Sequence, residues 1–486
     1  MLEKKNIAWL YFLAALFIAI NVYLVATRDT LFGLAIPIAV LAILLFFFAF
    51  DKAVLLTVFT IPLSIDISDA RFDLGISIPG EILLIGIMLV FIGKLIFERK
   101  FDGKLMRHPM TIIILIYLSW ILITAITSVR PVVSFKFLVA RLWFIIPMYF
   151  VATQLMKNPK NVQRFLWCYI VPLIIACIYT LLRHASRGFT QQAGHWVMYP
   201  FYNDHTAYGA ALALFFPALI GLAFSKQYSK KQRFISLLAT GFITIALVFS
   251  YCRAAWVSLA VALGVYFLIV LKIKFRYILI VTAILVGTFF AFQHQIVYSL
   301  EKNQDDSSSD FSQHLRSITN ISTDASNVER LNRWSSAIRM YKEKPVFGWG
   351  PGTYQFEYAP FQTTESKSVV STNHGDLGNA HSEYLGPLAE SGLMGMLTFI
   401  TLTICAIYYG IKVYQRQKNK KFKQIALWIT LGLVTYFIHG ILNNFLDTDK
   451  LAVPFWGFIA ILIAFDLYYR NDEETETVEK IGSGNE

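Results

Sequence analysis

The chain has 486 residues, of which 56% are hydrophobic and 15% are charged. Soluble domains carry about 25% charged residues, so this composition excludes an ordinary soluble protein. The net charge of +12 does not indicate nucleic-acid binding, because the Lys and Arg residues lie mostly in short runs between apolar stretches, where membrane topology and anionic lipid account for them. The four cysteines have no CxxC spacing, which gives no sign of a disulfide framework or a zinc site.

Apolar stretches follow one another along most of the chain, and about 20 helical residues are enough to cross the hydrocarbon core of a bilayer. The first stretch is similar to a signal peptide but lacks a small-residue cleavage site, so we interpret it as a retained span. The third is short, and the sequence leaves open whether it crosses fully. The sequence therefore predicts an all-α, polytopic transmembrane helix bundle of about 12–14 spans with one long helical extracytoplasmic loop. The predicted spans are 7–26, 31–50, 53–65, 80–97, 110–127, 134–155, 163–182, 205–224, 234–250, 254–271, 276–293, 384–411, 424–444 and 451–469.

The distribution of positive charge predicts how the bundle is oriented. If all these spans cross and the N-terminus is inside, the inner segments hold 25 Lys and Arg residues and the short outer loops hold seven. Cytoplasmic loops carry such an excess, so we expect both termini in the cytoplasm. The predicted organisation is an N-terminal transmembrane bundle over 1–293, an extracytoplasmic (periplasmic) loop over 294–383, C-terminal transmembrane helices over 384–470 and a disordered cytoplasmic tail over 471–486.

The long hydrophilic segment contains two predicted helices and a tight turn. Residues 326–344 carry apolar side chains at helical spacing, and Pro345 ends that helix. The stretch "PVFGWGPGTY" that follows is rich in glycine and proline, which predicts a tight turn before a short aromatic helix over 353–361. The sequence "NAHSEYLGPLAESGLMG", residues 379–395, then leads into the next span. It places His381 where the long loop meets the membrane.

Two arginines lie in or next to predicted spans. An Arg at the centre of a bilayer costs about 2.5–3.5 kcal/mol on insertion scales and is usually functional. Arg141 lies roughly 10 Å below the outer surface, judged from the helical rise, and we expect it to face an internal cavity. Arg253 occupies an outer turn between two spans, where it is either an interfacial anchor or part of a site.

Four segments between residues 199 and 395 carry a recognisable series of motifs. "YPFYNDHTAYGAALALFFP" contains an Asn before a span, and "FSYCRAAWVSL" contains Arg253 in its turn. "RLNRWSSAIRMYKEKPVFGWGPGTYQ" is a helix followed by a Pro–Gly–x–Gly turn, and "AHSEYLGPLAESGLMG" is a His-containing loop end. In this order they resemble the bacterial O-antigen ligase and O-antigen polymerase superfamily of integral-membrane glycan transferases. One departure is Cys252, which stands where the family usually has Ser, and the N-terminal third matches only as a series of hydrophobic spans.

The resemblance implies transfer of a glycan from undecaprenyl diphosphate to an acceptor hydroxyl at the outer face of the bacterial inner membrane, without a nucleotide, metal or other cofactor. The implied partners are the lipid-linked donor, a lipid or glycan acceptor and membrane lipids. Arginine forks bind phosphate oxygens bidentately, and a neutral imidazole accepts a proton near pH 7. We therefore predict Arg253 and His381 as catalytic, with His381 as the base. The predicted diphosphate- or glycan-binding residues are Arg141, Arg330, Arg333, Asn203, His205, Tyr354 and Tyr384.

Within the leading class, several points stay open. His381 is alternatively a residue that positions a substrate, and Tyr354 and Tyr384 are alternatively part of an interfacial aromatic belt. The motifs do not separate a ligase from a polymerase. The position of the His loop next to the membrane favours a ligase whose acceptor is lipid A–core. The repeat-unit sugars, the organism and the oligomeric state are not determined by the sequence.

Two other classes of function are also compatible with the sequence. A metal-dependent, lipid-linked glycosyltransferase would use an acidic pair, and Asp66 and Asp69, with Asp73 nearby, lie in a predicted outer loop. A lipid-linked glycan transporter or flippase would place Arg141 and Lys136 along a substrate path. The internal repeats typical of many secondary transporters are not evident.

Overall fold

The computed structural model describes residues 44–46, 48–69, 74–99, 101–273, 325–362 and 378–469, together with Leu16 and Val40. Within these residues, 10 helices are long and apolar enough to cross a membrane. This finding confirms the predicted all-α, polytopic fold class. The predicted span 276–293 lies outside the described residues, as does 7–26 except for Leu16, and the larger part of 31–50 also lies outside them.

The candidate membrane spans follow the predicted apolar stretches closely. One of them is composite, because α7 continues through the π-helical segment η2 into α8. The bounds are α4 (Gly80–Glu98), α6 (Pro109–Ile126), α7 (Pro131–Ile145), η2 (Ile146–Val151), α8 (Ala152–Leu155), α9 (Pro159–Ala185), α11 (His205–Phe224), α12 (Lys230–Phe249), α13 (Arg253–Val270), α18 (Leu385–Arg416), α19 (Lys420–Leu442) and α20 (Asp449–Tyr468). The shorter helices are α3 (Phe50–Thr60), η1 (Ile61–Leu63), α5 (Gly103–Met106), α10 (Gln191–Gly194), α16 (Ala325–Glu343), α17 (Tyr354–Glu357) and η3 (Ala359–Phe361).

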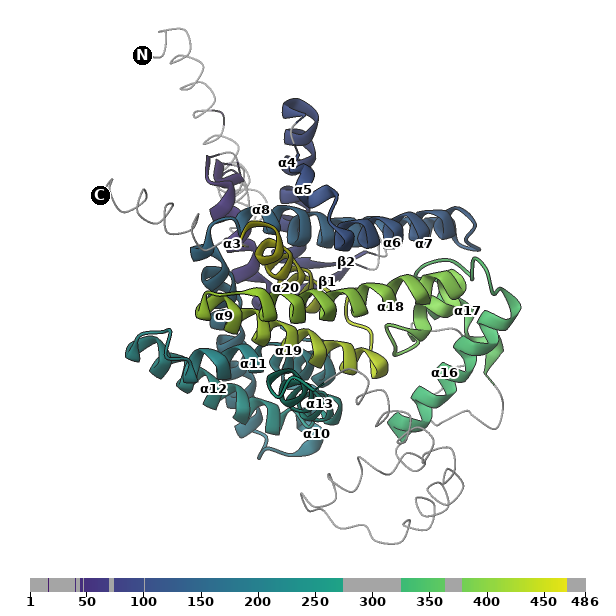
Figure 1. Cartoon of the computed structure of the whole chain (residues 1–486). Coiled ribbons are helices and arrows are strands. Elements are labelled where there is room, and N and C mark those ends of the chain that lie inside the picture. Colours follow the sequence, from purple (N-terminus) through teal and green to yellow (C-terminus); the bar gives the residue numbers. More distant parts are fainter. Residues whose placement is uncertain are drawn as a thin grey trace.

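Three helices form the centre of the bundle. In their most apolar windows, 83% of α11, 83% of α19 and 89% of α20 is buried inside the protein. A helix that is apolar all round suits such a position, because it offers no polar face to solvent. Around this centre, α7 lies against α6, α6 lies against α18, and α18 packs on the central helix α19 (Figure 1). The centre therefore consists of one helix from the N-terminal part of the chain and two from the C-terminal part.

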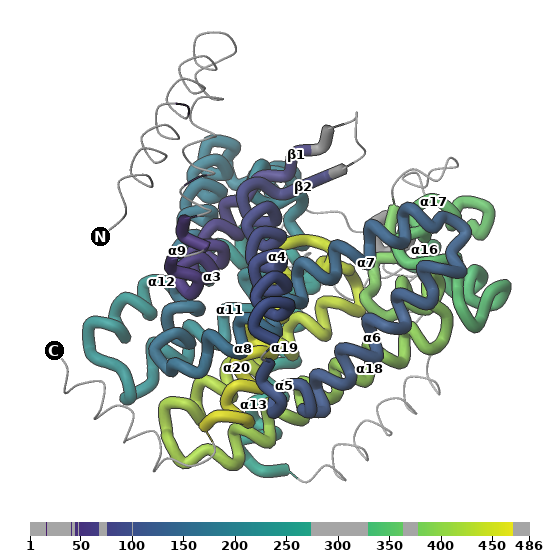
Figure 2. Tube along the Cα trace, turned by 90° about the horizontal axis from the view of Figure 1, so that it is seen from above, coloured from purple at the N-terminus to yellow at the C-terminus, as the bar shows by residue number. Residues whose placement is uncertain are grey.

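The region of the third predicted span differs from a full transmembrane helix. The helix α3 has 11 residues, which is about 16 Å of helix and about half of a hydrocarbon core. After η1 the chain forms a two-stranded antiparallel hairpin, β1 (Ile65–Asp69) and β2 (Leu74–Ile78), with Ile65 opposite Ile78. Figure 2 shows this hairpin at the edge of the bundle. The sequence reading missed it because strands of five residues are short against the surrounding apolar pattern.

The two predicted helices of the hydrophilic segment are present. The predicted helix 326–344 is α16, and the predicted helix 353–361 is α17 followed by η3. Both lie to one side of the bundle, beside the N-terminal end of α18 (Figures 1 and 2). We call this end of the bundle, which the charge pattern predicts to be extracytoplasmic, the outer end.

The glycine-rich turn between α16 and α17 docks onto a break in α18. Gly348 has φ 69° and Gly392 has φ 67°, a backbone region that favours glycine. A Cβ on Gly392 would collide with the Val346 carbonyl. The break lets the Leu393 N–H donate to the Pro345 carbonyl at 3.1 Å, and the Gly350 N–H donates to the Glu390 carbonyl at 2.7 Å. These contacts fix the outer helices against the membrane helix α18.

Candidate functional site

The predicted site histidine lies in a short loop, residues 378–384, that leads into α18; we call it the His loop. Its backbone is held from two directions. The Arg333 guanidinium of α16 donates to the Asn379 carbonyl at 2.9 Å, and the Glu383 N–H donates to the Gly440 carbonyl of α19 at 2.8 Å. His381 has φ 47°, and its N–H donates to Asn379 Oδ1 at 3.1 Å. The His loop is therefore a fixed element between α16 and α19.

Glu383 is the main anchor of this loop, and the sequence reading did not single it out. Its Oε1 accepts hydrogen bonds from Tyr436 Oη at 2.6 Å and from the N–H groups of Phe445 and Leu446, both at 2.9 Å. The side chain is buried. Burial, and next the nearby Asp447 carboxylate, raise the pKa of Glu383. The signal available in the sequence was an acid two residues after the histidine of a recognised motif.

The environment of His381 favours its neutral form. Burial and then the positive charges of Arg333 and Arg330 lower the pKa of His381 to about 4. At pH 7 the imidazole is therefore uncharged and has a lone pair that accepts a proton. This is the protonation state that a general base requires before reaction.

Arg330 lies near His381 and links it to residues of two further elements. Arg330 of α16 lies within electrostatic reach of both His381 and His205, and Arg253 is within reach of His205. Arg330 Nε donates to the Leu442 carbonyl at 3.3 Å. We call Arg253, Arg330, His205 and His381 the arginine–histidine cluster. The structure thus brings together four predicted site residues that are up to 176 residues apart in the sequence.

Two members of this cluster, His205 and Arg253, lie at the first residues of helices α11 and α13. Asp204 Oδ1 accepts from the N–H groups of Thr206 at 2.6 Å and Ala207 at 2.8 Å, so it caps α11 and puts His205 on the first turn. The His205 ring stacks on His195, with 4.4 Å between the ring centroids. Arg253 is the first residue of α13, and Cys252 precedes it at the N-cap position. The outer ends of α11 and α13 therefore carry the His205 and Arg253 side chains.

Arg333 lies next to the cluster, but its guanidinium group already interacts with other residues of this chain. Its Nε donates to Glu329 Oε1 at 2.7 Å, and both side chains are buried. Its guanidinium also lies over the Tyr358 ring, 5.3 Å from the centroid. These contacts fix the His loop and position its charge near His381. The assignment of Arg333 to diphosphate binding stays a prediction.

Arg141 lies in a different place from the cluster. It is buried and lines a cavity of about 460 Å³ between α7, α17 and the His loop, which agrees with the expectation that it faces an internal cavity. Its guanidinium pairs with Asp447 Oδ1 at 2.6 Å, donates to the Leu446 carbonyl and lies over the Phe137 ring. Its positive charge is thus balanced by a carboxylate of this chain.

The remaining predicted residues have contacts within the protein. Tyr354 stacks on Tyr358, with 5.2 Å between centroids, and its hydroxyl donates to the Arg333 carbonyl at 2.8 Å. The Tyr384 hydroxyl donates to the Phe437 carbonyl at 3.0 Å. Asn203 Nδ2 donates to Asp66 Oδ2 of the hairpin at 2.7 Å. Of these three, Tyr354 lines the cavity beside Arg141; their contact with a glycan stays a prediction.

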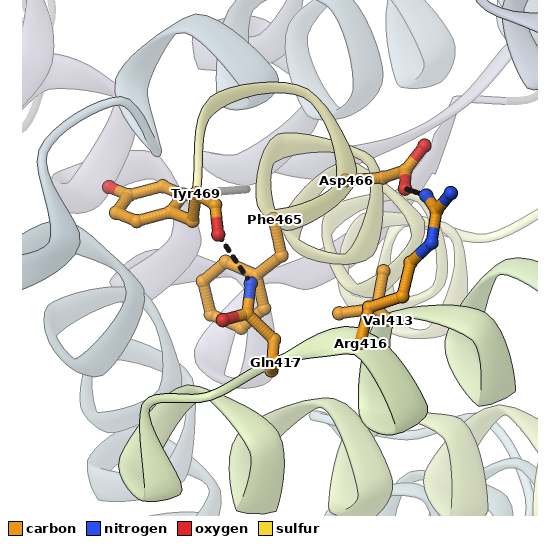
Figure 3. A pocket seen from close by; sticks show the side chains of 6 residues that line it. All are labelled: Val413, Arg416, Gln417, Phe465, Asp466 and Tyr469. Atoms are coloured by element: carbon orange, nitrogen blue, oxygen red, sulfur yellow. Dashed lines mark hydrogen bonds and ion pairs between the residues drawn. The ribbon is translucent and has the colours of Figure 1, made fainter. Parts of the chain in front are cut away.

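A second cavity, of about 230 Å³, lies at the opposite end of α18, roughly 45 Å along the helix from the His loop. Figure 3 shows Arg416, Gln417, Asp466 and Tyr469 among its lining residues. The buried Asp466 carboxylate pairs with Arg416 at 3.2 Å and Lys412 at 3.6 Å, and His108 lies 3.3 Å away. These contacts join the ends of α18 and α20, so we assign this network to the stability of the bundle.

The comparisons with known proteins match a segment of the chain that contains part of the candidate site. Residues 237–400 match a family model described as O-antigen ligase, and this segment includes Arg253, Arg330, Arg333 and His381. The chain is also similar to an uncharacterized protein of Haemophilus influenzae, with 26% identity over 237 residues. That alignment covers 47% of this chain and spans only 57% of the length of the relative. The match over residues 237–400, together with the multi-pass helical fold, supports a relationship of this chain to the O-antigen ligase superfamily.

Proposed function

We propose that the protein transfers a glycan from an undecaprenyl-diphosphate-linked donor to an acceptor hydroxyl at the outer face of the bacterial inner membrane. The observation that carries this proposal is the arginine–histidine cluster, in which Arg330 lies within electrostatic reach of His381 and His205, and Arg253 lies within reach of His205. Guanidinium groups bind phosphate oxygens and remain charged throughout the reaction. The proposed reaction needs both kinds of group: the arginines bind the diphosphate leaving group, and the imidazole accepts the proton that the acceptor hydroxyl loses.

The chemistry of the transfer follows from this arrangement. The acceptor oxygen forms a bond to the anomeric carbon of the donor sugar as the bond from that carbon to the diphosphate oxygen breaks. The acceptor proton moves to the His381 imidazole, and the electron pair of the broken bond stays on the diphosphate. Arg253 and Arg330 stabilise the negative charge that grows on the leaving oxygen, which lowers the barrier because this charge is larger in the transition state than in the ground state.

This arrangement predicts an unusual pH dependence. In the free protein His381 must be neutral, so kcat/KM should be constant near neutral pH and fall as the pH decreases through about 4. A bound diphosphate offsets the charge of the arginines, so the pKa of His381 should rise, and the acidic limb of kcat should lie at higher pH than that of kcat/KM. Steady-state rates between pH 4 and 9 test this. An acidic limb of kcat/KM near the ordinary histidine pKa of about 6.5 would contradict it.

The identity of the acceptor distinguishes two possible enzymes, a ligase and a polymerase. We favour a ligase that acts on lipid A–core. The His loop lies at the start of a membrane helix, which suits an acceptor embedded in the outer leaflet. Deletion of a ligase leaves long glycan on the lipid carrier and bare lipid A–core. Deletion of a polymerase leaves lipid A–core that carries single repeats. A gel of surface lipopolysaccharide from the deletion strain distinguishes these outcomes, and single-repeat bands would show that the protein is a polymerase.

The proposal requires the outer end to be extracytoplasmic. In a variant without the native cysteines, a cysteine at Lys342 on α16 should react with a membrane-impermeant maleimide in intact cells whose outer membrane is permeabilised. A cysteine at Lys418, between α18 and α19, should react only after the inner membrane is opened. Both positions are exposed, so accessibility within the protein does not limit either reaction. The reverse pattern would exclude a periplasmic site.

We expect the reaction to proceed without a divalent metal ion. Among the described residues there is no group of three or more His, Cys, Asp or Glu side chains that could hold one. Asp66, from the acidic pair of the metal-dependent alternative, hydrogen-bonds to Asn203 and Ser77, while the Asp69 side chain and Asp73 lie outside the described part of the chain. EDTA should therefore leave the transfer rate unchanged. Loss of activity in EDTA that Mg²⁺ or Mn²⁺ restores would support that alternative.

A further inference from the structure

An apolar groove lies toward the end of the bundle opposite to the outer end, which we call the inner end. Its volume is about 610 Å³, within the range of small-molecule sites. Its lining residues come from 216–225 at the end of α11, 259–266 in α13 and 424–431 near the start of α19. Since α11 and α13 begin at the outer end and α19 begins at the inner end, the groove is remote from the arginine–histidine cluster.

The helix α19 forms the floor of this groove, and α11 and α13 form its walls. Trp428 and Leu431 of α19 are buried, whereas Phe224 of α11 and Leu263 of α13 are 64% and 55% exposed within the described part of the chain. The floor lies close to α11 because Gly221 has no side chain, and a Cβ there would collide with the Trp428 ring. Exposed apolar side chains on a membrane helix suit contact with lipid chains. The groove therefore opens toward the hydrocarbon of the bilayer.

The length of the groove matches one leaflet of a bilayer. From Phe216 to Ser225 the chain rises about 14 Å along α11, and half of a hydrocarbon core is about 15 Å. An acyl chain that fills the groove has its headgroup at the inner end. A lipid whose phosphate lies at the outer end enters the other leaflet first. The position of the groove therefore distinguishes it from a site for the glycan donor.

Positive charge surrounds the inner mouth of the groove. Ser225 and Gln424 line this mouth, and the Ser225 hydroxyl donates to Gln424 Oε1 at 2.5 Å. The segments 225–233 and 418–424, which contain these two residues, hold eight Lys or Arg residues and no Asp or Glu. We call the eight the basic collar: Lys226, Lys230, Lys231, Arg233, Lys418, Lys420, Lys421 and Lys423.

The basic collar is held at the groove and has no ion pair with a carboxylate of the described residues. Arg233 Nε donates to the Ala223 carbonyl at 3.2 Å, and Lys421 lies over the Tyr228 ring, 5.3 Å from the centroid. Membrane topology accounts for cations at the inner end, but it does not require an apolar groove that opens among them. Basic clusters at the cytoplasmic ends of membrane helices bind anionic lipid headgroups.

We propose that this groove binds one anionic phospholipid of the inner leaflet, with an acyl chain between α11 and α13 and the phosphate at the basic collar. The site is separate from the proposed transfer reaction and does not depend on it. Each Lys or Arg near an anionic phosphate strengthens binding about fivefold. A zwitterionic lipid gains the contact with the apolar walls but little from the collar. The headgroup therefore decides which lipid is retained.

Native mass spectrometry of the full-length protein in detergent tests the specificity for the headgroup. The probes are phosphatidylglycerol, which is anionic, and phosphatidylcholine with the same acyl chains, which is zwitterionic. Wild type should bind the first phosphatidylglycerol at least tenfold more tightly than the first phosphatidylcholine. The double variant Lys226→Gln/Lys423→Gln should weaken binding of phosphatidylglycerol about tenfold or more, because it removes two collar charges next to the mouth.

A matched double variant removes the same charge elsewhere at the inner end. Lys104 and Arg107 are exposed, lie in and beside α5, and belong to a predicted inner segment. Figure 1 shows α5 and α13 on opposite sides of the bundle. Lys104→Gln/Arg107→Gln should therefore leave the affinity for phosphatidylglycerol within twofold of wild type.

A pair of neighbouring substitutions on α13 tests the position of the acyl chain. Ala260 lines the groove, whereas Val261 is 37% exposed and does not line it. Ala260→Trp should weaken binding of both lipids at least fivefold because the indole occupies the groove. Val261→Trp should leave both affinities within twofold of wild type. The collar variant keeps the proposal testable if Ala260→Trp does not fold.

Three results would each overturn the proposal. The first is a wild-type protein with no preference for phosphatidylglycerol. The second is an equal loss in the collar and α5 variants, which would show a general attraction of anionic lipid to the inner end. The third is unchanged binding in folded Ala260→Trp, which is expected if the predicted span 276–293 or another segment of this chain fills the groove. None of these measurements uses glycan transfer, so each outcome is independent of the proposed function.

Discussion

His381→Asn is expected to lower kcat by about 10²–10⁴-fold, the range that general-base catalysis contributes. Asparagine removes the proton acceptor but tolerates the left-handed backbone that His381 adopts, with φ 47°. The contacts of Arg333 and Glu383 that hold the His loop involve other atoms and should persist. The measurement is single-turnover transfer with a lipid-linked donor, compared with wild type at pH 7.5.

Two further observations separate a base from a residue that merely shapes the loop. Added imidazole should restore part of the activity of His381→Asn, since it enters the space of the missing ring. The thermal midpoint should stay close to that of wild type. Activity above a tenth of the wild-type rate would show that His381 positions a substrate and does not accept the proton.

Arg253→Lys is expected to lose about 10²–10³-fold in kcat, comparable to the loss of one preorganised donor to a developing oxyanion. Lysine keeps the positive charge but lacks the planar fork that binds two phosphate oxygens at once. Arg253→Ala should be at least as impaired, because it removes the charge as well. The rate of undecaprenyl diphosphate release from a lipid-linked glycan measures both effects.

Arg187→Ala supplies the matched control for Arg253. Arg187 also lies at the outer end, is exposed and stacks over Trp196, 5.5 Å from the ring centroid. This contact is typical of an interfacial cation, so its removal should leave the rate within twofold of wild type. If Arg253→Ala behaves in the same way as Arg187→Ala, then Arg253 is an interfacial anchor and the diphosphate site lies elsewhere.

Much of the architecture could be predicted from the sequence. The helices of the bundle follow apolar runs, and a helix in lipid satisfies its backbone hydrogen bonds within its own segment. The outer helix α16 ends within one residue of its predicted end because Pro345 stops it. The motifs around Arg253 and His381 lie in the segment that matches the O-antigen ligase model. Each of these features depends on residues that are close together in the sequence.

Other features depended on contacts between distant parts of the chain. The bonds from Glu383 to Phe445 and Leu446 join residues 62 and 63 positions apart, and no periodic pattern in either segment indicates that pairing. The hairpin β1–β2 and the neutralisation of Arg141 by Asp447 were likewise missed. Such pairings depend on how each helix is rotated and how each loop closes, which a sequence window does not contain.

The sequence by itself determined which segments are helical, which class of membrane protein they form and which motifs carry the arginines and the histidine. Only the tertiary structure decided that Arg330 lies beside His381, whereas Arg141 lies across the His loop in a cavity rich in carboxylates. The physical reason is that hydropathy and helix propensity are local properties. The pKa of a histidine and the charge of a cavity wall depend on several side chains from distant parts of the sequence. These side chains lie close together only after the chain has folded.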